Sequence, residues 1–181
     1  GCTLATSSDL VDFFRQHLLG TADDVSVRGY LRICHDICHA AVMYEDQAAA
    51  LQRYRDMGLQ VGKVQISSAL SANLQGQARA ASLEALQPFC DERYLHQSVL
   101  RTGSQTQFFE DLPEALDAVR AGEQADELRT HFHVPIDLEA VGPLRTTRDA
   151  ITDCLRAIRP SDEVHHFEVE TYAWQVLPEA L

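Results

Sequence analysis

Residues 28–39, RGYLRICHDICH, contain the motif that decides how this sequence is interpreted. The pattern of residues 28–36 predicts a β-strand, and Asp36 stands where that strand should end. His39 follows three residues later. Two residues that could bind a metal therefore lie at the end of a predicted strand. Enzymes built on parallel strands place their active sites at this end.

Further apolar runs predict three more core strands, and helical patterns lie between them. Alternating strands and helices are typical of a parallel sheet. A (β/α)8 barrel uses about 31 residues for each unit, and two gaps between strand centres come near that value. We therefore expect part of a barrel with one inserted hairpin, although an open doubly wound sheet is an alternative. The predicted strands are residues 61–67, 128–135 and 164–171, the predicted helices are residues 7–18, 46–57, 75–87, 112–120 and 146–158, and the predicted hairpin is residues 94–110.

The composition excludes several partners. The chain has 181 residues, and its 15 Lys and Arg against 27 Asp and Glu give a net charge of 15 − 27 = −12. Nucleic acids and anionic membranes attract clustered basic residues, so neither is expected as a partner. No apolar run reaches about 18 residues, so no membrane insertion is expected. Five scattered cysteines do not form a disulfide framework, and they predict a cytoplasmic protein.

Polar side chains share one face on each of the last three predicted strands, because side chains alternate along a strand. Burying Asp, Glu and His is costly unless they are paired or bind a cation, so the joint pattern indicates a metal site. Each residue also has a structural interpretation, as a hydrogen-bonding histidine or a salt-bridged glutamate. Mixed nitrogen and oxygen ligands suit Zn²⁺, Mn²⁺ or Fe²⁺ better than Ca²⁺. These polar groups are Lys63, Gln65 and Ser67, then His131 and His133, and then His166, Glu168 and Glu170.

A second metal arrangement uses the cysteines around the motif. This segment contains the ligand types of a zinc site, in Cys34, His35, Cys38 and His39. Alternation along a strand spreads these four groups apart, and cysteine commonly packs as a small hydrophobic residue. This zinc site is therefore an alternative to the carboxylate-containing one.

The D-x-C-H sequence of residues 36–39 resembles the metal-binding segment of the xylose-isomerase-like TIM-barrel superfamily, which includes endonuclease IV and sugar isomerases and epimerases. Longer strings occur in an order that resembles the C-terminal half of the EboE-type metabolite-traffic proteins, over nearly the whole chain. They are ICHDICHAAVMYEDQAAAL, VGKVQISSAL, YLHQ, DLPEAL, THFHVPI and FEVETYAWQVLP.

This resemblance implies a (β/α)8 TIM barrel of the xylose-isomerase-like type. Residues 1–181 would be the C-terminal part of that single domain, with a β-hairpin insertion at about residues 94–110. Earlier strands, one ending in a metal-binding glutamate, would precede Gly1. The resemblance also implies that Asp36, His39, Gln65, His131 and Glu170 bind the metal, although His131 replaces an aspartate of the family pattern. The remaining candidates are His133 and Glu168 as catalytic groups and His96, which has no counterpart in the superfamily.

Three functions remain open. The family resemblance implies a protein that binds a divalent metal and a small sugar-like metabolite and passes it to proteins of the same pathway. A metal-dependent sugar isomerase or epimerase is the enzymatic alternative, because these reactions need acid and base groups beside the metal. A phosphodiesterase of the endonuclease IV type is disfavoured by the charge of −12.

Overall fold

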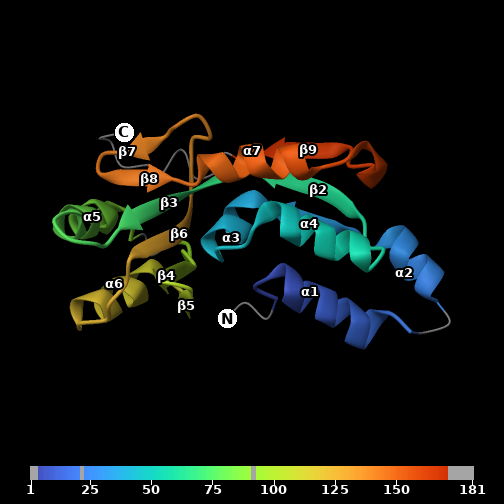
Figure 1. The fold of residues 1–181 in the computed structure, drawn as a ribbon, viewed down its shortest axis with the longest axis horizontal. Helices are drawn as coiled ribbons and strands as arrows, with labels where there is room; N and C mark the ends of the chain where they lie inside the picture. Colours follow the sequence, from blue (N-terminus) through green and yellow to red (C-terminus); the bar gives the residue numbers. More distant parts are fainter. Residues whose placement is uncertain (1–3, 21–22, 91–92, 171–181) are drawn as a thin grey trace. The chain divides into compact units, whose positions relative to one another are not determined.

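The computed structural model describes residues 4–20, 23–90 and 93–170 (Figure 1). These residues divide into two units. Unit 1 holds the described residues up to Ile66 and those from Asp149 to Glu170, and unit 2 holds those from Ser67 to Arg148. Within the described ranges, no helix combines the length and the apolar character that crossing a membrane requires.

Unit 1 is built on a three-stranded parallel sheet with the strand order β1-β2-β9. In its register, Asp36 lies beside Gln65, and Gln65 lies beside Glu168. Apolar side chains of the helices and of one sheet face form the core of this unit, which includes Leu51 and Val64. The elements of unit 1 are α1 (Ser7–Phe13), the π-helical turn η1 (Phe14–Leu18), α2 (Asp24–Tyr30), β1 (Ile33–Asp36), α3 (Ile37–Val42), α4 (Gln47–Asp56), β2 (Val61–Ile66), α7 (Arg148–Ala157, which begins in unit 2), the 3-10 turn η3 (Pro160–Asp162) and β9 (His166–Val169).

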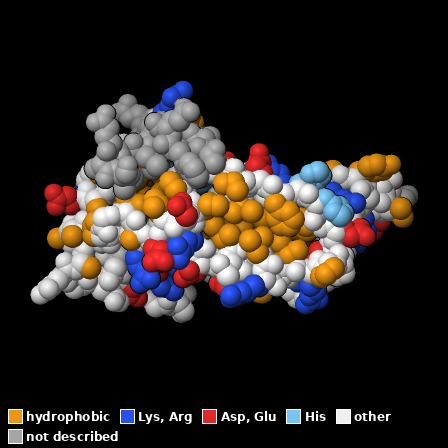
Figure 2. Space-filling model, turned by 90° about the horizontal axis from the view of Figure 1, so that it is seen from above, with side chains coloured by type: hydrophobic (Ala, Val, Ile, Leu, Met, Phe, Trp, Pro, Cys, Tyr) orange, Lys and Arg blue, Asp and Glu red, His pale blue; other side chains and the backbone are white. Residues whose placement is uncertain are grey.

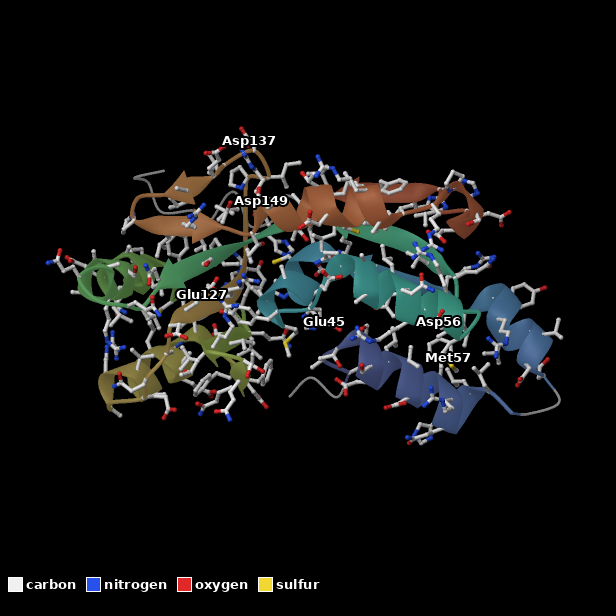
Figure 3. The ribbon with its side chains drawn as sticks, in the orientation of Figure 1. Glu45, Asp56, Met57, Glu127, Asp137 and Asp149 are labelled. Carbon is white, nitrogen blue, oxygen red and sulfur yellow. The ribbon has the colours of Figure 1, made fainter. Side chains whose placement is uncertain are left out.

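Helix α4 shows how local sequence sets the ends of an element. The Asp46 side chain accepts a hydrogen bond from the backbone of Ala49 and so caps the first turn. Gly58 follows the helix with φ = +64°, a conformation that glycine adopts without a steric cost. Just before the cap, Glu45 (Figure 3) accepts hydrogen bonds of 2.9 and 2.5 Å from the backbone N and Oγ of Ser7 in α1. The predicted helix over residues 46–57 is confirmed.

Unit 2 is built on a six-stranded antiparallel sheet with the order β5-β4-β6-β3-β8-β7. Its helices bury apolar side chains, among them Leu86 and Leu116, against sheet residues such as Leu70 and Leu128. The predicted hairpin is present as β4 and β5, with Gly103 at φ = +58° in its turn. The elements of unit 2 are β3 (Ser68–Asn73), α5 (Ala78–Leu86), the 3-10 turn η2 (Gln87–Phe89), β4 (Ser98–Thr102), β5 (Gln105–Phe109), α6 (Leu112–Arg120), β6 (Glu127–Val134), β7 (Ala140–Val141) and β8 (Leu144–Thr146).

The expected half of a (β/α)8 TIM barrel is wrong. The described residues form one parallel and one antiparallel sheet, and they contain no closed barrel. The spacing of the predicted strands suggested repeated βαβ units, but spacing does not fix the direction in which two strands pair. β3 (SALSAN) was not predicted, because its small side chains lack the β-branched pattern of a strand. It pairs antiparallel with β6, so the predicted strand over residues 128–135 belongs to the antiparallel sheet.

The strand predicted over residues 28–36 is shorter than expected. Helix α2 occupies residues up to Tyr30, and β1 covers only Ile33–Asp36. Helix α3 follows β1 directly, so Asp36 is both the last residue of a strand and the N-cap of a helix. Of the last predicted strand, β9 covers His166–Val169, and Thr171 lies outside the described residues.

Candidate functional site

The two faces of the parallel sheet in unit 1 differ in chemistry. Residues in register on neighbouring strands point to the same side. One side is largely apolar and includes Val64, Ile66 and Phe167. The other side combines carboxylates, an amine, an amide, a thiol and an imidazole. In register order these groups are Cys34, Lys63 and His166, followed by Asp36, Gln65 and Glu168.

Asp36 is held by the helix that it caps. Its Oδ1 accepts hydrogen bonds from the backbone N–H groups of Cys38 at 2.9 Å and His39 at 3.3 Å. A carboxylate suits the position because the unpaired amides at a helix start carry partial positive charge. The local sequence D-I-C-H therefore fixes the direction of the carboxylate at the carboxyl end of β1.

Gln65 and Glu170 meet at the same end of the sheet. The Gln65 side-chain amide donates a hydrogen bond of 2.6 Å from Nε2 to Oε2 of Glu170. Its Oε1 lies 3.0 Å from the Cys34 thiol, which donates to it. The backbone N–H of Glu170 donates to the carbonyl of Ile66 at 3.2 Å, which continues the pairing of β9 with β2 past Val169.

Two carboxylates approach each other at this end. A carboxylate oxygen of Asp36 lies within 4.8 Å of a carboxylate oxygen of Glu170. Burial raises the pKa of Glu170, and the negative charges of Asp36 and Glu168 raise it further. Lys63 and the Gln65 hydrogen bond act in the opposite direction and do not cancel this effect. The site therefore disfavours its own negative charge, and a cation would relieve that.

Glu168 has a different environment from Glu170, although both side chains are on the polar face. It forms an ion pair with Lys63 on the neighbouring strand. The hydrogen bond with Glu168 is the main reason that the pKa of Lys63 is raised. The two glutamates therefore have different neighbours: Glu168 lies beside an ammonium group, and Glu170 lies beside an amide and a second carboxylate.

His131 and His133 lie two residues apart on β6 in unit 2. Their Nε2 atoms are 2.9 Å apart, and their ring centroids are 4.9 Å apart. Two imidazole nitrogens at this distance either share one proton or direct both lone pairs at one cation. Among the described residues, this histidine pair and the pair of Asp36 and Glu170 each belong to a set of side chains close enough together to hold a metal ion.

The other predicted residues have structural partners. His39 donates from Nε2 to the backbone carbonyl of Ala5 at 2.8 Å, which turns that nitrogen toward the segment before α1. His96 is buried in unit 2, and its ring stacks on Phe132 at 5.0 Å. The backbone N–H of His96 donates to Asp111, which also caps α6. Asp111 was not singled out from the sequence, although an Asp directly before Leu-Pro-Glu is a helix-start signal.

The four residues of the alternative zinc site differ in burial and in the residues that they contact. Cys34 is exposed and bonds to Gln65, whereas Cys38 is fully buried, and burial raises the pKa of its thiol. His35 is buried and lies 2.8 Å from Oε1 of Gln47 through its Nε2. Alternation along β1 separates Cys34 from His35, whereas Cys38 and His39 lie on helix α3.

Comparison with protein-family models, with curated proteins and with solved structures gave no match to this chain.

Proposed function

We propose that unit 1 binds a divalent cation at the carboxyl ends of β1, β2 and β9. Asp36 and Glu170 would supply carboxylate oxygens, and the Gln65 amide would supply its oxygen after rotating about its last side-chain bond. The observation that carries the proposal is the approach of the two carboxylates within 4.8 Å at the end of a parallel sheet. Such a pair is electrostatically unfavourable unless a cation lies between its members.

The donor set fits a hard or borderline cation. Carboxylate and amide oxygens suit Mg²⁺ and Mn²⁺, and added imidazole nitrogens suit Zn²⁺ and Fe²⁺. Mn²⁺ is the practical probe because its paramagnetism reports binding directly. The capped Oδ1 of Asp36 supports the fit, since a ligand carboxylate that is itself hydrogen-bonded is held in one orientation.

The cation would hold a small, hydroxyl-rich metabolite for processing or for transfer to proteins of the same pathway. This part of the proposal rests on the resemblance to the EboE-type proteins and on the polar face around the carboxylates. A neutral metabolite suits the site, because the divalent cation and Lys63 together balance the charges of Asp36, Glu168 and Glu170.

A metal-dependent isomerase or epimerase is the second candidate. The observation that favours it is the ion pair of Lys63 and Glu168, on the same sheet face as the carboxylates. A neighbouring amine and carboxylate can donate and accept a proton, which these reactions require.

The first experiment measures Mn²⁺ binding to the whole chain by water-proton relaxation. We expect Asp36→Asn and Glu170→Gln each to weaken Mn²⁺ affinity at least ten-fold. The matched control is Asp12→Asn, which removes an exposed carboxylate that forms an ion pair with Arg15. Equal affinity in the wild type and both site variants would show that the proposed metal site is wrong.

A second experiment separates binding from catalysis. The Mn²⁺-loaded chain is incubated with a panel of aldoses and ketoses in D₂O, and proton NMR follows exchange at the carbons next to the carbonyl. Exchange that disappears in Glu168→Gln supports the isomerase. Metal binding without any exchange supports the binding role.

A further inference from the structure

Strand β9 forms an edge of the parallel sheet in unit 1. Its one partner among the described residues is β2, and no described strand pairs with its other side. Strands of parallel sheets are usually buried on both faces. All four residues of β9 are exposed, including Phe167 at 47% and Val169 at 42%. Figure 2 shows hydrophobic side chains gathered over α7 and β9.

The backbone of β9 presents hydrogen-bonding groups along this edge. The N–H of Glu170 donates to the carbonyl of Ile66 on β2, so the even-numbered residues of β9 direct their backbone N–H and C=O groups toward β2. Phe167 and Val169 have the opposite parity. Their N–H and C=O groups therefore point to the outer edge, where an added strand would pair with them.

A shallow groove of about 620 Å³ lies beside the first residues of β9. It is lined by residues from both sheet faces, with Phe167 on the apolar face and Lys63, His166 and Glu168 on the polar face, together with His165. The groove thus has the two kinds of wall that the alternating side chains of an extended peptide would contact.

We propose that the outer edge of β9 receives an extended segment of another polypeptide, which adds a strand to the sheet. The segment alternates apolar and basic residues. Its apolar side chains cover Phe167 and Val169, and its basic side chains face Glu168 and Glu170. The proposal shares Glu170 with the proposed metal site but does not rest on it, because the strand edge and its two faces carry it; since a bound cation would neutralise Asp36 and Glu170, the segment is expected to bind the cation-free chain.

Charge selects this occupant over a second copy of the chain. The polar face carries three carboxylates, those of Asp36, Glu168 and Glu170, against the one ammonium group of Lys63. Two copies paired through β9 would bring their glutamates together, and like charges on paired strands are destabilising. The net charge of −12 adds to that repulsion.

The test uses two fluorescein-labelled octapeptides and the whole chain. One peptide alternates Val and Lys, the other alternates Val and Glu, and fluorescence anisotropy at about 150 mM salt measures their binding. We expect saturable binding of the Val-Lys peptide at least ten-fold tighter than that of the Val-Glu peptide. Glu168→Gln should reduce this preference at least three-fold.

The decisive variant is Val169→Pro. Proline removes an outward N–H and leaves the bonds between β9 and β2 in place, as is tolerated on edge strands. We expect it to weaken Val-Lys binding at least ten-fold while circular dichroism and Mn²⁺ affinity stay unchanged. Equal binding of both peptides, or unchanged binding by a folded Val169→Pro variant, would overturn the proposal. A wild-type dimer that Val169→Pro dissociates would also overturn it, since the occupant would then be a second copy.

Discussion

The ion pair of Arg55 and Asp162 connects α4 to the η3 turn across 107 residues of sequence. Arg55 donates to both carboxylate oxygens, from Nε at 2.8 Å and from Nη2 at 2.6 Å, and Nη2 also donates to the carbonyl of Ala157 at 2.7 Å. The two side chains are only 18% and 13% exposed. This fork geometry in partly buried surroundings gives more stability than an exposed pair.

Replacing Asp162 with Ala leaves the guanidinium of Arg55 without its carboxylate partner. Hydrogen bonds to charged groups contribute about 1.5–3 kcal/mol, and we expect a loss of that size in the free energy of unfolding at pH 7. Urea denaturation followed by circular dichroism measures it. Asp12→Asn is the control, because the Asp12–Arg15 pair is exposed on both sides and should change stability by less than about 0.5 kcal/mol.

The pH dependence gives a second readout of the same pair. The hydrogen bonds from Arg55 hold the pKa of Asp162 below its ordinary value. A lowered pKa in the folded state means that the pair's stabilisation is present above the unfolded pKa, near 4, and is lost as the pH falls through the folded pKa. The difference between wild type and Asp162→Ala should therefore be constant from about pH 7 to pH 5 and shrink at lower pH. A difference below about 0.5 kcal/mol at pH 7, or one that grows toward acid, would refute this reasoning.

Two further predictions concern unit 2. Leu70→Ala, at a fully buried core position, should lower the free energy of unfolding by about 2–5 kcal/mol. Leu144→Met, which nearly conserves the volume of a buried side chain, should lower it by less than about 1.5 kcal/mol. Similar urea midpoints for the two variants would contradict the packing of this core. His131→Asn should weaken Zn²⁺ binding by the histidine pair at least ten-fold in isothermal titration, because only one imidazole remains. An unchanged affinity would show that the 2.9 Å approach of the two Nε2 atoms is a hydrogen bond only.

The sequence predicted best what depends on neighbouring residues. The helix over residues 46–57 has a capping aspartate and a terminal glycine, and the hairpin has Gly103 in its turn, so local chemistry sets both. The shared polar face of Lys63 and Gln65 also follows from alternation alone and is confirmed by the register.

Pairing between distant segments could not be predicted in the same way. Nothing in the sequence of β6 indicates that it runs antiparallel to β3, because strand direction depends on the path of the intervening chain. The contacts of the predicted site residues could not be predicted for the same reason, because they also join distant segments. The contacts of His39 with Ala5 and of Glu170 with Gln65 span 34 and 105 residues, and no local pattern encodes them.

The two glutamates after Phe167 illustrate what the structure adds to such a pattern. By alternation alone, Glu168 and Glu170 are equivalent, since both side chains lie on the polar face. The register brings Lys63 to Glu168 and the Gln65 amide to Glu170. The pKa of Glu170 is raised because burial and repulsion by Asp36 outweigh the attraction of Lys63. A cation gains more binding free energy beside the carboxylate that does not pair with Lys63. Mn²⁺ affinity should therefore fall far more in Glu170→Gln than in Glu168→Gln.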